Sequence, residues 1–450
     1  MTRTCRALLL AGLLARAAVL PLPGTEDVQV WKTWSYAATN GISSMYGIGG
    51  HPPQRGVVTW GARHTTVDYP PGGLYGLGLI GRLYRAIDPS YVDGTALTVA
   101  IKSTILLADG LVCLFVWLLA ARWLGPRGGQ TAALSYWLNP GTLMDGAVLG
   151  YLDPWAGAAM MGALLAADAA LPFLTGLAIA VAVMTKVQAI LAAPVAAILL
   201  MKRSTARARS ILYATAAAIV TSAIVLLPFA ARGALPNVAQ GVGSLFRHDM
   251  LSGTAANLWW IVTWLLRASY AVHDLGTWAA WTMPVRILGI SRVVALGYPN
   301  PRPIGLALAA AAMAWAFWRT RHGTPALACA AGAFAVHAYF VLEVQVHENH
   351  LYAALPLAAC AATVLPRLRA PYALMSVVFA LNLWMFYGFG RGYPGPPRGI
   401  TVIDATVWLS FVSVGALAWH ARRLWQASEQ PAHPPAIDRQ CHAGDERCRR

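Results

Sequence analysis

The chain has 450 residues, of which 57% are hydrophobic and 12% are charged. Soluble globular proteins carry about 25% charged residues, so this chain has too few charges to cover a soluble surface. The formal net charge of +16 does not indicate nucleic acid, because the Lys and Arg residues lie in short segments between apolar runs, as in the cytoplasmic loops of membrane proteins. The composition predicts one multi-pass integral membrane domain with no nucleic-acid partner.

The first apolar run, Ala7–Leu20, follows two arginines and is interrupted by Arg16. Its length fits a signal peptide, which has a short apolar core behind a basic start. A retained transmembrane helix is the preferred interpretation, because Arg16 lies within the run and no small-residue cleavage site precedes Pro21.

The longest polar segment comes next and is named here the first loop (residues 21–97). Glu26 and Asp27 directly follow the first apolar run, and Asp68 precedes two prolines, which favour an extended backbone at the residue before them. The segment Leu74–Tyr84 is amphipathic and suits a helix lying in the membrane interface. The first loop is therefore expected to carry interfacial helices over the external membrane surface.

Basic clusters separate the later apolar runs and predict the topology, because positive residues remain in the cytoplasm. The clusters are Arg3/Arg6, Arg122/Arg127, Lys202/Arg203/Arg207/Arg209, Arg319/Arg321, Arg367/Arg369 and Arg422/Arg423. Residues 127–202 fit four short crossings, whereas Leu258–Leu266 and Trp278–Leu288 fit either crossings or interfacial helices. We expect an all-α fold with about 12 to 14 transmembrane helices in one domain, residues 1–425. A polar cytoplasmic tail, residues 426–450, is expected to be disordered.

This topology places the polar residues that could carry chemistry on one external face. They are Glu26, Asp27, Asp68, Asp145, Asp153, Arg247-His248-Asp249 and His347-Glu348-Asn349-His350. Lys102 and Asp109 are different, because they lie seven residues apart on one face of an apolar helix. Charges inside a bilayer are costly, so structural pairing with other helices is the preferred interpretation for both.

Five motifs in chain order resemble those of the GT-C-type glycosyltransferases. They are Asp27 to Trp34 with Asp68-Tyr69-Pro70-Pro71, Leu138-Asn139-Pro140 to Asp153, Lys186-Val187-Gln188, Ser244-Leu245-Phe246-Arg247 to Trp259, and Val346-His347-Glu348. The chain looks most like the endoplasmic-reticulum glucosyltransferases that use dolichyl-phosphate-glucose and their bacterial relatives that use polyprenyl-phosphate-mannose. Two features depart from the family pattern. Asn349 stands where a basic residue is often found, and Ser43–Thr66 has no counterpart.

The resemblance implies an inverting glycosyltransferase that moves mannose or glucose from a polyprenyl or dolichyl monophosphate to a hydroxyl on a lipid-linked glycan or another acceptor. It implies Asp27 as the catalytic base, with Glu26 as the second candidate, since a carboxylate in hydrogen-bond reach can take the acceptor proton. The alternative for Asp27 is the N-cap of a helix over Val28–Thr39, a position that favours Asp.

Other motif residues are expected to bind the substrates. His347, Lys186 and Arg247 are candidates for the lipid phosphate, and Gln188 is expected to assist Lys186. The candidates for sugar or acceptor hydroxyls are Asp68, Asp145, Asp153 and Glu348. Simple capping remains an alternative for Asp145 and Asp153, and a solvated loop charge for Arg247. A cofactor is not expected, because a lipid monophosphate needs a metal less than a nucleotide diphosphate does; a divalent metal remains open.

The alternative function is a non-catalytic transporter or flippase of lipid-linked saccharides, which would also gather polar residues in a helical bundle. Transporters usually contain internal repeats and broken helices at the bilayer midplane. This sequence has no evident repeat and places its acids at one face, which favours the enzyme. The expected partners are the polyprenyl-linked donor, the acceptor and membrane lipids. The Ala- and Arg-rich composition favours a bacterial plasma membrane over the endoplasmic reticulum.

Overall fold

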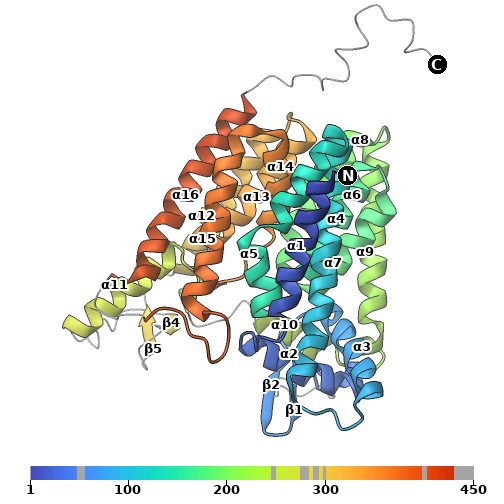
Figure 1. The fold of residues 1–450 in the computed structure, drawn as a ribbon, viewed down its shortest axis with the longest axis vertical. Coiled ribbons are helices and arrows are strands. Elements are labelled where there is room, and N and C mark those ends of the chain that lie inside the picture. Colours follow the sequence, from blue (N-terminus) through green and yellow to red (C-terminus); the bar gives the residue numbers. More distant parts are fainter. Residues whose placement is uncertain are drawn as a thin grey trace, which may run out of the picture.

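The computed structural model describes residues 2–47, 56–244, 250–273, 283–286, 293–296, 301–397 and 403–429. Helices run side by side along the long dimension of the molecule, and the first loop lies at one end of them (Figure 1). Four helical segments of the described chain are long and apolar enough to span a membrane: Thr95–Trp137, Arg207–Ala230, Pro325–Leu342 and Pro366–Tyr387. The protein is an all-α, multi-pass membrane protein, as predicted.

The first helix, α1 (Arg3–Val19), packs against α4 (Thr95–Trp137) through buried polar contacts. Arg16 is buried and donates from Nε to the Asp109 carboxylate at 2.7 Å. Lys102 donates to three backbone carbonyl oxygens at 3.0 to 3.2 Å. The charges on α4 therefore have structural partners, as predicted, and Arg16 joins α1 to the bundle.

Helix α4 consists of two arms that fold back on each other. Gly125 separates them with φ +73, a conformation that favours glycine, and Pro126 follows it. The Cys113 thiol of the first arm donates to the Ala133 carbonyl of the second at 3.7 Å. The chain therefore turns where the Arg122/Arg127 cluster predicts a cytoplasmic end.

The predicted short crossings between residues 127 and 202 are present as helices with turns at the predicted places. The elements are α5 (Pro140–Thr142), the π-helix η2 (Leu143–Leu149), α6 (Asp153–Asp168), α7 (Pro172–Thr185), η3 (Val187–Ala192) and α8 (Ala193–Arg203). At the end opposite the first loop, buried Asp168 accepts from Arg122 Nε at 2.6 Å and from Arg203 Nε at 2.9 Å. These ion pairs hold two basic clusters together.

The rest of the described chain continues the bundle. The remaining helices are α9 (Arg207–Ala230), α10 (Leu235–Ser244), α11 (Leu258–His273), α12 (Pro301–Thr320), α13 (Pro325–Leu342), α14 (Ala354–Val364), η5 (Pro366–Leu368), α15 (Arg369–Tyr387) and α16 (Ala405–Ser428). Most of the predicted tail, residues 430–450, lies outside the described residues, as does Arg247.

One helix prediction is wrong. Trp278–Leu288 was expected to cross the membrane or lie in its interface, but its described part forms strand β4 (Met283–Arg286), antiparallel to β5 (Val293–Leu296). The physical reason is that Val285 pairs with Val294 across the two strands, and β-branched residues favour strands.

The first loop is built from α2 (Glu26–Thr39), η1 (Ile42–Ser44), β1 (Val57–Trp60), β2 (Arg63–Thr66) and α3 (Pro71–Ile87). Helices α2 and α3 touch closely at Gly81, where a Cβ atom would lie 2.2 Å from the Ser35 carbonyl oxygen. Trp31, Trp34 and Leu74 are buried in the core between them. This packing gives α2 a fixed position at the end of the bundle.

Candidate functional site

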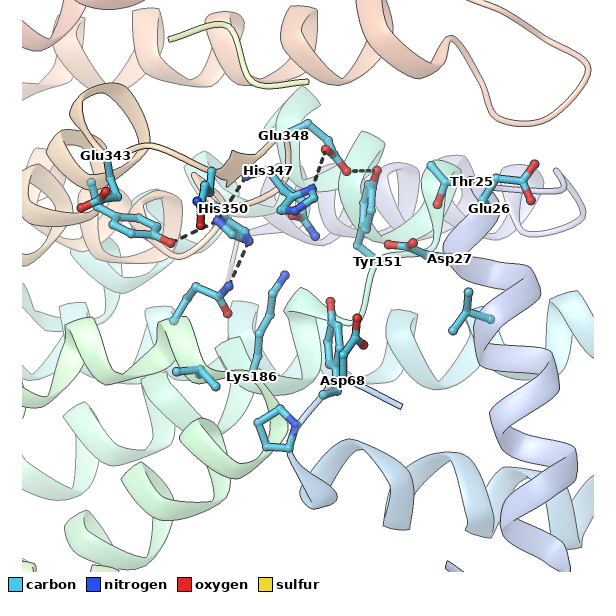
Figure 2. Close-up of a pocket in the computed structure, with 18 of the residues that line it drawn as sticks. Thr25, Glu26, Asp27, Asp68, Tyr151, Lys186, Glu343, His347, Glu348 and His350 are labelled. Atoms are coloured by element: carbon cyan, nitrogen blue, oxygen red, sulfur yellow. Dashed lines mark hydrogen bonds and ion pairs between the residues drawn. The ribbon is translucent and has the colours of Figure 1, made fainter. Parts of the chain in front are cut away.

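A cavity of about 1010 Å³ lies between the first loop and the adjoining ends of the bundle helices. Segments from α2, β2, the turn after α7, the start of α12 and the chain after α13 contribute to its wall. The predicted site residues that line it are Glu26, Asp27, Asp68, Lys186, Gln188, His347 and Glu348. The fold thus brings together motifs that are far apart in the sequence (Figure 2).

Asp27 lies in the first turn of α2 and is half-buried. The N-cap position belongs to Thr25, so the alternative interpretation of Asp27 as the cap is wrong; the helix begins at Glu26. No hydrogen-bond partner for the Asp27 carboxylate is present among the described residues. Burial raises the pKa of Asp27 to about 7; the nearby Glu348 carboxylate adds to this rise and Lys186 opposes it. Asp27 is therefore a carboxylate able to accept a proton near neutral pH.

Glu26 points away from Asp27 (Figure 2). Its side chain is 74% exposed and lies 2.9 Å from Arg391, which follows α15. The backbone makes a second connection between these segments. The Arg391 N–H donates to the Gly24 carbonyl at 2.8 Å, and Gly24 forms a parallel β-bridge with Gly390. The segment after α15 thus holds the chain immediately before α2.

Lys186 and Asp153 form a buried ion pair at the start of α6 and the end of α7. The Lys186 ammonium lies 2.7 and 2.6 Å from the two Asp153 carboxylate oxygens. Asn349, which replaces the basic residue of the family pattern, donates to the same carboxylate at 2.9 Å. Asp153 itself does not line the main cavity, so its contact with that space runs through Lys186.

His347 is the last residue of the strand β6 (Val346–His347), which pairs in parallel with β3 (Ser252–Gly253), and Glu348 follows it. Glu348 is buried and accepts hydrogen bonds from Tyr151 and Thr254. Burial raises its pKa, and these hydrogen bonds partly offset the rise. Burial and the Lys186 charge lower the pKa of His347 to about 4. His347 is therefore neutral at pH 7 and can donate one hydrogen bond.

Gln188 and Asp68 line the cavity in other roles. The Gln188 amide nitrogen lies 2.9 Å from His350 Nε2 and not against Lys186. Asp68 lies between β2 and α3, next to Tyr69, whose carbonyl accepts from the Tyr46 hydroxyl. Its carboxylate contributes to the raised pKa of Asp27, which places both charges on the same part of the site.

Asp145 is not brought to the cavity. It lies on η2, is fully buried, and neither of its carboxylate oxygens has a hydrogen-bond partner within the described part of the chain. Its predicted contact with sugar hydroxyls therefore has no support in the cavity lining. Arg247, as noted, is outside the described residues.

The fold is similar to that of several solved structures. No family model and no curated protein matches the sequence. ArnT from Cupriavidus metallidurans in the apo state matches with a TM-score of 0.50 and 15% identity, over 94% of this chain and 75% of that chain. The protein has the GT-C fold.

Two further structures match with lower TM-scores. ArnT bound to undecaprenyl phosphate gives 0.49 with 14% identity, over 95% of this chain and 76% of that one. The Archaeoglobus fulgidus oligosaccharyltransferase in the apo form gives 0.44 with 13% identity. The match covers 96% of this chain and 56% of the archaeal chain.

Several residues that line the cavity of this GT-C fold were not predicted from the sequence. Tyr151 follows η2 and bonds Glu348, and Tyr387 ends α15 within 2.8 Å of Thr254. Arg302, in the first turn of α12, adds a cation to the cavity wall. Tyrosines next to apolar runs give no distinctive signal in one sequence, but Arg302 directly before an apolar run could have been noticed.

No group of three or more His, Cys, Asp or Glu side chains that could hold a metal ion is found in the described part of the GT-C fold. The carboxylates are spread over different walls, and Asp153 is engaged by Lys186. The expectation that no cofactor is needed stays a prediction.

Proposed function

We propose that the protein is an inverting glycosyltransferase that moves a hexose, mannose or glucose, from a polyprenyl or dolichyl monophosphate to a hydroxyl of a lipid-linked glycan or another acceptor. The observation that carries this proposal is Asp27. Its carboxylate faces a large cavity, has no partner among the described residues, and has a pKa raised to about 7. Such a group is suited to take a proton from an acceptor hydroxyl at neutral pH.

The proposed reaction is a single displacement. The acceptor oxygen attacks the anomeric carbon while Asp27 takes the hydroxyl proton. The bond between the anomeric carbon and the phosphate oxygen breaks on the opposite face, and the lipid phosphate leaves with the electron pair. One base is sufficient for this inversion.

Three nitrogen groups support binding of the leaving phosphate. Lys186 and Arg302 line the cavity as cations, and neutral His347 lies between Lys186 and Glu348 in Figure 2. Asp153 and Asn349 hold Lys186 in one position. A fixed ammonium costs little reorganisation when negative charge develops on the phosphate.

An apolar part of the wall supports a lipid-linked donor. It is formed by Val187, Ile190 and Leu191 after α7, and by Pro303 and Leu306 of α12. These side chains offer a polyprenyl chain an apolar path beside the side chains proposed to bind the phosphate. The basic residues Arg122 and Arg203 lie at the opposite end of the bundle. The positive-inside rule makes that end cytoplasmic, so the cavity is proposed to face outward, from a bacterial plasma membrane.

The test is turnover of radiolabelled polyprenyl-phosphate-mannose and polyprenyl-phosphate-glucose by the purified protein in nanodiscs. The proposal expects cleavage of the anomeric bond by the wild type and its loss in D27N, while donor binding persists. A transporter or flippase would move the labelled lipid between leaflets of vesicles without cleaving it, and that result would overturn the proposal.

A further inference from the structure

The cavity has two chemically different walls. The wall formed after α7 and by α12 is apolar, with Lys186 and Arg302 beside it. The other wall is formed by α2 and strand β2, with His64, Thr65 and Thr66 among its residues. The strand belongs to Ser43–Thr66, the segment without a counterpart in the family resemblance.

The strands β1 and β2 form a hairpin with a defined register. Val57 pairs with Thr66, and the Val67 N–H donates to the Gly56 carbonyl at 3.1 Å. Because side chains alternate along a strand, His64 and Thr66 lie on one face of β2, and Thr65 lies on the other, where it meets Trp34. The cavity borders both faces, since all three residues line it.

The hairpin is fixed to α2 at several points. Trp34 Nε1 donates to the Thr65 hydroxyl at 3.1 Å. Trp60 stacks on Tyr36 with ring centroids 5.4 Å apart. Asp93 binds both Lys32 of α2 and Arg63 of the hairpin. The hairpin is therefore a preformed part of the cavity wall, which reduces the ordering cost of binding.

The hairpin offers uncharged hydrogen-bonding groups to the cavity. Within the described chain, no residue bonds the Thr66 hydroxyl. The Thr65 hydroxyl accepts from Trp34 and keeps its own proton to donate. His64 uses Nδ1 with the Thr59 hydroxyl at 3.2 Å, which leaves Nε2 for a ligand. Hydroxyl and imidazole groups both donate and accept, as sugar hydroxyls require.

The charges on this side disfavour an anionic ligand. Asp27 and Asp68 line the cavity, and Asp68 is among the charges that raise the pKa of Asp27. Arg63, the cation of β2, binds Asp93 and does not line the cavity. An acceptor bearing a phosphate or carboxylate would meet like charges here, which cost binding free energy.

We infer that the β1–β2 hairpin forms the acceptor side of the cavity and selects an uncharged saccharide. This inference rests on the proposed function. It assigns the apolar wall to the lipid donor, the hairpin wall to the acceptor, and the proton transfer at Asp27 to the junction between them.

The experiment uses the full chain in nanodiscs, with the polyprenyl-phosphate-hexose that it turns over as donor. Hexyl mannoside and its 6-phosphate are the acceptor probes. The wild type is expected to use the uncharged glycoside with a kcat/KM about tenfold higher or more. Thr66→Val keeps the side-chain volume and removes the hydroxyl. It should raise the KM for hexyl mannoside about fivefold, the effect of one lost hydrogen bond.

The matched control is Val57→Thr, on the residue paired with Thr66. Val57 is 56% exposed and does not line the cavity. The KM of the Val57→Thr variant for hexyl mannoside should therefore equal that of the wild type. Three results would overturn the inference: preference for the phosphorylated glycoside, equal acceptor KM in T66V and V57T, or donor hydrolysis without transfer to the uncharged glycoside. Absence of donor cleavage by the wild type under all conditions would instead overturn the proposed function itself.

Discussion

The Lys186 ammonium lies within 2.7 Å of both carboxylate oxygens of Asp153, in a site where each side chain is at most 7% exposed. Removing one member of a buried ion pair leaves the other charge without compensation in a region of low dielectric. The pair therefore affects both the stability of the fold and the availability of Lys186 to a phosphate.

The single variant K186M is expected to lower the free energy of unfolding by about 3–5 kcal/mol, because Asp153 would remain buried and charged. The double variant K186M/D153N removes both charges and should recover most of this loss. Thermal unfolding in detergent measures both. Donor turnover should remain low in the stable double variant, since the ammonium is still absent. Equal unfolding temperatures for K186M and the wild type would contradict the prediction.

The two neighbouring carboxylates at the start of α2 should differ sharply. D27N is expected to lower kcat by about 10² to 10⁴, the usual contribution of a general base, with little change in the donor KM. E26Q should be affected far less, because Glu26 is exposed and paired with Arg391. Steady-state kinetics of donor turnover compare the two. A greater loss in E26Q would move the base assignment to Glu26.

The pH dependence follows from the raised pKa of Asp27. The base acts as a carboxylate, so kcat/KM should be constant above about pH 7 and fall about tenfold per pH unit below it. Glu348 is the largest charge contribution to this rise. E348Q should therefore move the acidic limb to lower pH. An acidic limb near pH 4 in the wild type would contradict the raised pKa of Asp27.

Gly253 offers a steric test of His347. A Cβ atom at Gly253 would lie 2.8 Å from the His347 Nδ1 atom, so G253A should displace the imidazole and raise the donor KM. The matched control is G243A in α10, where an added Cβ meets nothing within 4 Å. Kinetics of both variants, with thermal unfolding as the check on folding, measure the effect. Equal donor KM values would remove His347 from the donor site.

Much of the architecture could be predicted because membrane burial leaves a strong pattern. Apolar runs and basic clusters gave the bundle and the turns at Asp153, Asp168 and Lys186. The failure at Met283–Arg286 has a different origin. A short apolar run is compatible with either a helix or a strand, and cross-strand pairing such as that of Val285 with Val294 decides between them.

The residues that line the site could be predicted better than the contacts that they make with one another. Asp27, Lys186 and His347 share one cavity, as motif order suggested. The partner of Gln188 was predicted as Lys186 but is His350, because contacts between segments distant in the chain depend on how the helices pack. The position of Asp145 was equally hard to predict, because the π-helix η2 buries its side chain outside the cavity wall.

The contact between Gly24 and the segment around Gly390 has a consequence for biosynthesis. Residues before α2 are among the first to leave the ribosome, whereas Gly390 and Arg391 emerge only after α15 has been made. A nascent chain can therefore insert most of its helices while the start of α2 still lacks this connection. Completion of the first loop is thus one of the last steps in assembly, and a chain stalled before Gly390 would hold Asp27 without its final support.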